Sequence, residues 1–281
     1  MGFDWKKEIV MHQYVLRLGF RVLVFLLVLW AYFFQPHYFD YIMTKTVELK
    51  YELQGFELSE VKELWASQYS VIWMYALWAI FMFSMFIQMF IHNSSLTMGA
   101  RKVFEPNFEP VENYDEGRLY KYIVKENLGA LKVLFAWLGL NGAIGCLYVF
   151  DIIGIKELCL LCAFYYLSDL ICVVIWCPFQ RFLMKNRCCV NCRIFNWGFF
   201  MIFTPFLFIR NFFTWSLFFM SCVLLIRWEW SINKYPERFW EGSNEVLKCA
   251  NCKDRVCKIK GKKVFDDEGK LIETIRGGKN V

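Results

Sequence analysis

Long apolar runs separated by polar segments dominate the chain. Each run is comparable in length with the roughly 20 residues that an α-helix needs to cross a bilayer. We predict six membrane-spanning helices, at about residues 18–34, 69–92, 128–150, 155–177, 195–209 and 212–226. The last two come from one apolar stretch that is too long for a single span and is interrupted by Pro205 and by Arg210-Asn211. The predicted fold class is therefore all-α, a polytopic membrane protein.

The segments between the runs predict three smaller elements. Amphipathic patterns at residues 56–69 and 114–127 predict two helices at the membrane surface, the second leading into the third span. Near the C-terminus, residues 263–265 and 271–275 flank a polar turn that contains Gly269, which predicts a β-hairpin. The predicted organisation is a transmembrane domain at residues 1–226, followed by a basic, cysteine-containing tail at residues 227–281.

Composition excludes a soluble or a disordered chain. Of the 281 residues, 58% are hydrophobic and 20% are aromatic, too many for a water-soluble globule of this size. The charged residues, 21% of the chain, are concentrated between the apolar runs. If the N-terminus is cytoplasmic, the inner segments hold 25 Lys and Arg residues and the outer loops hold five. The positive-inside rule then predicts a multi-pass inner-membrane protein with both termini cytoplasmic.

The net charge of +6 is explained by this topology and does not require a nucleic-acid partner. Basic segments beside the spans face anionic headgroups in any case. We therefore expect the lipid bilayer as a partner, together with a cytoplasmic or membrane protein, and no nucleic acid.

Seven of the twelve cysteines are predicted to lie at the cytoplasmic boundary, where a disulfide framework is not expected. Residues 189–193 and 249–253 repeat one pattern, C-x-N-C followed by a basic residue. Two such pairs supply the four sulfurs of a tetrahedral zinc site, in which amides and a neighbouring positive charge stabilise the thiolates. The predicted metal ligands are Cys189, Cys192, Cys249 and Cys252, and the spare ligands are Cys177, Cys188 and Cys257.

The metal is predicted to join the loop between the fourth and fifth spans to the C-terminal tail. Zinc is favoured, and iron or an iron–sulfur cluster is the alternative, although the C-x2-C-x2-C run of bacterial ferredoxins is missing. A different interpretation is that these are unrelated thiols beside the membrane, such as palmitoylation sites.

Three further cysteines, Cys146, Cys159 and Cys162, are predicted near the outer face. The Cys159-x-x-Cys162 pair at the start of a span resembles that of the quinone-linked membrane enzymes that make disulfides. The resemblance covers four residues, and the second cysteine pair of those enzymes is missing. It implies a thiol redox role, whereas the simpler interpretation is that the thiols are packed apolar groups.

Beyond the first three residues of each predicted span, the charged residues are Arg21, Lys132 and Asp169. A charge at a helix centre costs about 2.5 to 3.5 kcal/mol, so each needs a partner or a route to the headgroups. Arg21 and Lys132 lie near helix ends and are expected to extend towards the headgroups. Asp169 is expected to form a buried pair with Lys132. A transporter that uses Asp169 is the corresponding functional hypothesis.

No serine-triad, phosphate-loop or H-E-x-x-H pattern is found, and the chain has three histidines. We therefore favour a non-enzymatic membrane protein with a structural zinc site that serves as a scaffold or partner platform. The alternatives are a membrane oxidoreductase with an iron–sulfur or thiol site, and a small ion or solute transporter.

Overall fold

The computed structural model describes residues 5–34, 39, 75–90, 105–186, 188, 191–252, 263–265 and 271–274. The predicted surface helix at residues 56–69 lies outside these residues. Four described helices have the length and apolar composition to cross a membrane, at His12–Phe34, Glu116–Val149, Ile155–Val174 and Phe212–Lys234. Two shorter apolar helical segments accompany them, Tyr75–Phe90 and Arg193–Phe208. These features are those of a helical membrane protein.

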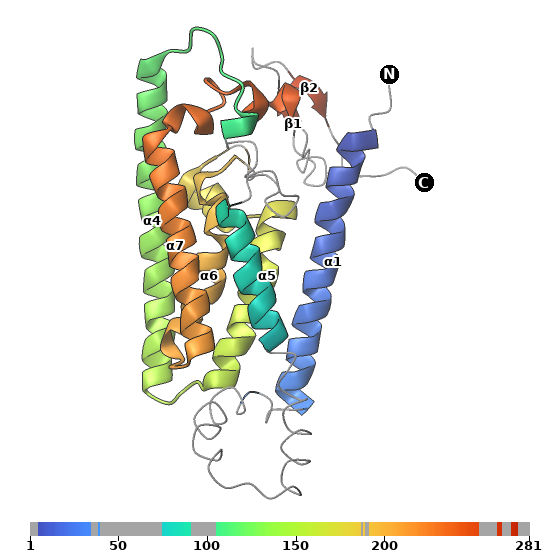
Figure 1. Cartoon of the computed structure of the whole chain (residues 1–281), viewed down its shortest axis with the longest axis vertical. Coiled ribbons are helices and arrows are strands. Elements are labelled where there is room, and N and C mark those ends of the chain that lie inside the picture. The colour runs from blue at the N-terminus through green and yellow to red at the C-terminus, as the bar shows by residue number, and fades with distance from the viewer. Residues whose placement is uncertain are drawn as a thin grey trace, which may run out of the picture.

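The described helices form an elongated bundle (Figure 1). The α-helices are α1 Trp5–Phe34, Tyr75–Phe90 (teal), α4 Glu116–Val149, α5 Ile155–Val174, α6 Gly198–Phe203 and α7 Phe212–Lys234. Short 3₁₀ helices are η3 Glu105–Asn107, η5 Arg193–Trp197, η6 Thr204–Phe208, η7 Pro236–Phe239, η8 Glu245–Leu247 and η9 Cys249–Asn251, and η4 Phe179–Met184 is a π-helix. Strands β1 Lys263–Phe265 and β2 Leu271–Thr274 pair antiparallel, which confirms the predicted hairpin.

Contacts at the helix ends give the relative direction of two pairs of helices. On the teal helix, Trp78 Nε1 donates to Ser216 Oγ at 2.8 Å near the start of α7, and Phe90 stacks on Arg227 near its end. The teal helix is therefore parallel to α7. Arg21, in the middle of α1, contacts Asp169 in the second half of α5. Tyr32, near the end of α1, contacts Glu157 at the start of α5. Helices α1 and α5 are therefore antiparallel.

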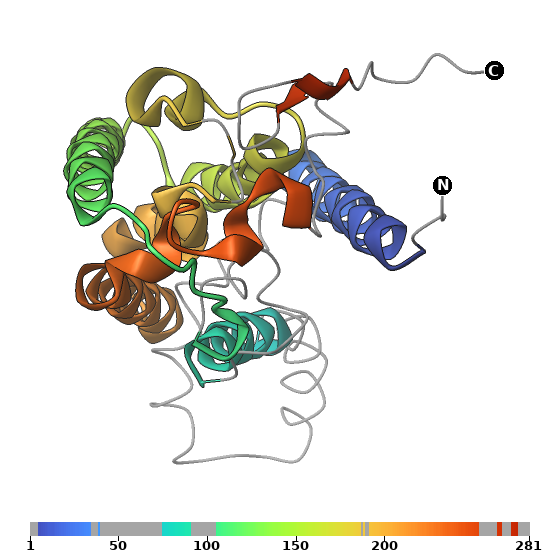
Figure 2. The same cartoon turned by 90° about the horizontal axis from the view of Figure 1, so that it is seen from above.

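The α6 and η6 segment lies between α4, α5 and α7, as the view along the bundle shows (Figure 2). Its side chains Phe200 and Phe203 share a buried cluster with Trp137, Tyr165 and Leu217 from those helices. The rings of Trp137 and Tyr165 lie 4.6 Å apart, so α4 and α5 meet through large side chains. Away from this contact, α5 packs chiefly against α1 and α6.

Several boundaries differ from the sequence prediction. Helix α1 begins at Trp5 instead of residue 18, and α5 ends at Val174 instead of residue 177. The predicted surface helix at 114–127 and the third span are one continuous helix, α4, because no breaker separates the amphipathic part from the apolar part. Asp115 starts it, since its Oδ1 accepts hydrogen bonds from the backbone N–H groups of Gly117 and Arg118 at 2.8 and 3.2 Å. The last helix continues beyond residue 226 to Lys234, while Asn211 caps its N-terminus as the predicted break requires.

The predicted pair between Asp169 and Lys132 is wrong. Asp169 Oδ2 lies 2.6 Å from Arg21 Nη1, and the same nitrogen donates to the backbone oxygen of Tyr166 at 2.7 Å. Lys132 is exposed. The reason is that α5 packs against α1, so the carboxylate meets a cation of α1. Arg21 therefore does not extend freely to the headgroups, and its charge is compensated inside the bundle.

Candidate functional site

One end of the bundle is covered by three segments, of which the structure describes residues 105–115, 175–186 with 188 and 191–197, and 235–252, and which we call the capped end (Figure 1). The last segment, which is part of the tail, folds back over the helices and bonds to the first. The backbone N–H of Val111 donates to the Ser243 carbonyl at 3.1 Å, and that of Glu245 donates to the Glu109 carbonyl at 2.9 Å. The chain that follows α7 is therefore held against the loop that precedes α4.

Asn244 organises this turn of the tail. It is fully buried, and its Nδ2 donates to the carbonyl of Arg238 at 2.8 Å while its Oδ1 accepts from the N–H of Val246 at 3.1 Å. The hydroxyl of Ser243 donates to the carbonyl of Glu237 at 2.6 Å. These bonds fix the position of η8 and of the C-x-N-C motif that follows it.

Both C-x-N-C motifs bind to η8 through their asparagines. Asn191 Nδ2 donates to the carbonyl of Leu247 at 3.0 Å, and Asn251 Nδ2 donates to the carbonyl of Glu245 at 3.1 Å. The acceptors are the first and last residues of the same three-residue turn. The Asn191 bond joins segments that are 56 positions apart in sequence, whereas the Asn251 bond is local and orients the second motif on η8. Cys192 is the next residue after Asn191.

Cys192 is the buried cysteine of this contact. Its side chain is 5% exposed and packs in the cluster that holds Leu247, Met184 and Trp197. Asn186 Nδ2 approaches its sulfur at 3.5 Å and also donates to Glu126 Oε2 at 3.0 Å. Burial raises the pKa of the Cys192 thiol to about 12, so without a bound cation it is a neutral thiol at physiological pH.

The other predicted ligands differ in exposure, and two of them are not described. Cys189 and Cys257 lie outside the described residues, and Cys249 is exposed while Cys252 is partly exposed. In the second motif the N–H of Cys252 donates to the carbonyl of Cys249 at 3.3 Å, which closes a tight turn. Of the spare ligands, Cys188 packs beside the α5 cluster around Val174, and Cys177 is buried where α5 ends. Within the described residues, no three His, Cys, Asp or Glu side chains are grouped as a metal site.

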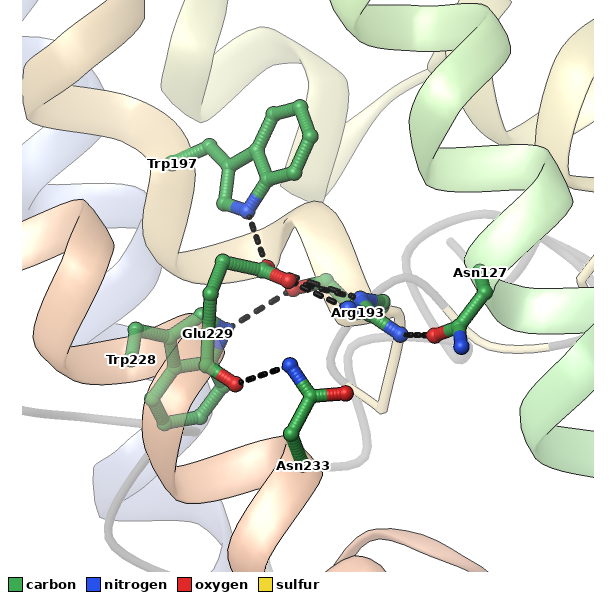
Figure 3. Close-up of polar contacts among 6 residues, drawn as sticks. All are labelled: Asn127, Arg193, Trp197, Trp228, Glu229 and Asn233. Atoms are coloured by element: carbon green, nitrogen blue, oxygen red, sulfur yellow. Dashed lines mark hydrogen bonds and ion pairs between the residues drawn. The ribbon is translucent and has the colours of Figure 1, made fainter.

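Arg193, which follows Cys192, is held by a polar network that sequence reasoning did not find (Figure 3). Its guanidinium forms an ion pair with Glu229 of α7, with Nε donating to Oε2 at 3.1 Å, and a further bond to Asn127 of α4. Trp197 Nε1 donates to Glu229 Oε1 at 2.8 Å, and Trp228 Nε1 donates to the Arg193 carbonyl at 2.9 Å. The network ties the fifth apolar segment to α4 and α7.

This network corrects one expectation about the motif. The basic residue after the first C-x-N-C was expected to stabilise its thiolates, but the Arg193 charge is compensated by Glu229. The N–H of Ile194 instead bonds to the Cys192 sulfur. A signal for Glu229 was present in the sequence, since it is the one carboxylate in an aromatic segment, between Trp228 and Trp230. Hydropathy alone placed it outside the last span.

The three cysteines that were predicted near the outer face lie on α4 and α5. Cys146 is exposed, Cys159 is partly buried and Cys162 is 5% exposed. None of these three thiols forms a disulfide with another described cysteine. A redox role for them stays a prediction.

No protein-family model, curated protein or solved structure matches this chain. The assignment of function therefore depends on the geometry of the capped end.

Proposed function

We propose that the capped end is a structural zinc centre in which Cys189, Cys192, Cys249 and Cys252 bind one ion. The observation that carries the proposal is that Asn191 and Asn251, the equivalent residues of the two motifs, both donate to η8. Two C-x-x-C pairs supply the four sulfurs of a tetrahedral zinc site, and the sulfurs of Cys192, Cys249 and Cys252, which are not grouped in the described fold, would move together around the ion.

The protein that carries this centre is proposed to cross the inner membrane six times with both termini in the cytoplasm. The alternating directions of the helices support this topology, because they bring the start of α1, the start of α4 and the end of α7 to one end of the bundle (Figure 1). The excess of Lys and Arg in the segments of that end supports its cytoplasmic placement. The two shorter segments, Tyr75–Phe90 and Arg193–Phe208, would complete the six passes.

Zinc would give this end of the molecule a rigid surface. Structural zinc sites contribute about 10 to 16 kcal/mol of binding free energy to the folded state. The centre would hold the tail on the loop between α5 and α6, and the polar surface above it would serve as a platform for a cytoplasmic or membrane protein. Iron in the same four-thiolate site is the alternative metal, and we propose no catalytic reaction for it.

Metal analysis of cysteine variants tests the proposal. Wild-type protein purified without chelator is expected to hold about one zinc per chain, and Cys192→Ser and Cys252→Ser are each expected to lose it. Cys222→Ser, which changes a cysteine within α7, is the matched control and should keep its metal. Full zinc content in both motif variants, or equal loss in the control, would contradict the proposed ligands.

The redox and transport alternatives are not favoured by a specific contact. Asp169 is engaged by Arg21, which gives this carboxylate a structural role. Iron–sulfur absorbance in anaerobically purified protein would favour the oxidoreductase over the zinc scaffold.

A further inference from the structure

A cavity of about 310 Å³ opens within the capped end, directly after the last residue of α5. One wall is apolar and consists of Ile175 and Trp176, which are 57% and 52% exposed. Arg181 and Lys185 also line the cavity and bring two cations to it. The ring of Trp176 packs edge-on against Phe182, itself 64% exposed, at a centroid distance of 6.1 Å, which extends the apolar wall outwards.

The backbone around the cavity is fixed by buried hydrogen bonds. Gln180 is 5% exposed, and its Nε2 donates to the carbonyl of Asn186 at 2.7 Å while the Asn186 N–H donates back to the Gln180 carbonyl at 3.3 Å. Lys185 ends the π-helix in the left-handed conformation, with φ of 55°, and its N–H also bonds to the Gln180 carbonyl. The left-handed turn closes the loop and keeps both cations on the rim of one cavity.

The rim carries a charge that the described part of the chain does not neutralise. Among the described residues, no acidic side chain forms an ion pair with Arg181 or Lys185. The other lining polar groups, Gln180 and Asn186, are uncharged. Two cations on a preformed cavity are suited to an anion such as a phosphate, to which Arg and Lys donate charge-assisted hydrogen bonds.

We propose that this cavity binds the phosphate group of an anionic phospholipid. The apolar wall decides between a lipid and a soluble phosphate, because Ile175, Trp176 and Phe182 are exposed at the point where an apolar helix ends. Acyl chains would cover these three side chains while the headgroup phosphate bonds to Arg181 and Lys185. Tryptophan at this level is typical of a membrane interface. The cavity adjoins the proposed zinc centre, because Asn186 lines it and also contacts the Cys192 sulfur, but neither of its two cations belongs to the proposed ligand set.

Lipid binding to purified full-length protein tests this site. Native mass spectrometry in detergent would measure the affinity for phosphatidylglycerol and for phosphatidylcholine with the same acyl chains. The test variant is Arg181→Gln/Lys185→Gln. The control is Lys121→Gln/Lys125→Gln, which removes the same charge from exposed positions of α4 at the same end of the bundle.

Each basic side chain near an anionic lipid surface contributes about a factor of five to binding. The test variant should therefore bind phosphatidylglycerol about 25-fold more weakly, and the control should retain wild-type affinity. Phosphatidylcholine has the same phosphate but no net charge, so it should bind more weakly than phosphatidylglycerol and lose less affinity in the test variant. Zinc content and thermal stability, measured on the same samples, show whether the loop has kept its fold.

Three results would overturn the proposal. The first is wild-type phosphatidylglycerol affinity in a folded test variant. The second is an equal loss in the control, which would show general charge attraction. The third is displacement of phosphatidylglycerol by inorganic phosphate at equal concentration, which would assign the cavity to a soluble anion.

Discussion

Glu229→Gln is the substitution that tests the polar network of the capped end. Glu229 accepts hydrogen bonds from Arg193 and from Trp197 Nε1, and the side chains of Glu229 and Arg193 are 24% and 8% exposed. Removing the carboxylate charge leaves the nearly buried guanidinium of Arg193 without a charged partner in the network. Its other side-chain partner there, Asn127, is uncharged. Breaking a buried pair in this way costs about 3 to 5 kcal/mol.

The partial exposure of Glu229 places the expected loss near the lower limit, at about 3 kcal/mol. For a chain of this size that corresponds to a fall of roughly 6 to 12 °C in Tm. Thermal unfolding in detergent, followed by intrinsic tryptophan fluorescence, would measure it. Arg118→Gln is the control, because its ion pair with Asp115 is exposed at 78% and 58% and should contribute less than about 1 kcal/mol.

A second variant separates the ion pair from its surroundings. Arg193→Met/Glu229→Met replaces both charges with apolar side chains, and it should be more stable than Glu229→Gln because no unpaired charge remains. Equal shifts in Tm for Glu229→Gln and the Arg118→Gln control would refute a stabilising role for the network.

Two further predictions use the same thermal assay. A Cβ at Gly145 would lie 2.3 Å from the ring of Phe208, so Gly145→Ala should lose about 1 to 3 kcal/mol. A Cβ at Gly142, on the same helix, would meet no atom within 4 Å, so Gly142→Ala should be neutral or gain up to about 1 kcal/mol; similar values for the two would contradict the close packing. Asp169→Asn should lose about 2 to 3 kcal/mol of stability, because the charge of Arg21 is left unpaired. Lys132 is exposed, so Lys132→Gln should change stability by less than about 0.5 kcal/mol. A larger loss in Lys132→Gln than in Asp169→Asn would favour the pair between Asp169 and Lys132.

The helical segments could be predicted because hydropathy and capping act locally. The break between η6 and α7 follows from Pro205 and from Asn211, whose side chain accepts from the N–H of Phe213 at 3.1 Å. The hairpin of the tail also follows from local alternation and a polar turn. Both features depend on residues within a few positions of one another.

The neighbours of each helix could not be predicted in the same way. Two helices joined by a short turn were expected to pack side by side, which placed Asp169 beside Lys132. In the fold, side chains of α6 such as Phe200 occupy the space between α4 and α5, and Asp169 meets Arg21 instead. A pattern of apolar residues that is similar on all faces of α5 carries no information on which helix it contacts.

The candidate site was predicted in part. The repeated motif indicated that the loop before Arg193 and the tail belong together, and the bonds of Asn191 and Asn251 to η8 bring them together in the fold. The role of Asn244 and the pairing of Glu229 with Arg193 could not be predicted, because each depends on contacts between segments far apart in sequence.

X-ray absorption at the zinc edge of purified wild-type protein tests the central claim most directly. The proposed centre predicts about one zinc per chain in a shell of four sulfur atoms at about 2.3 Å. A metal-free protein, or a metal with mainly nitrogen and oxygen neighbours, would contradict it.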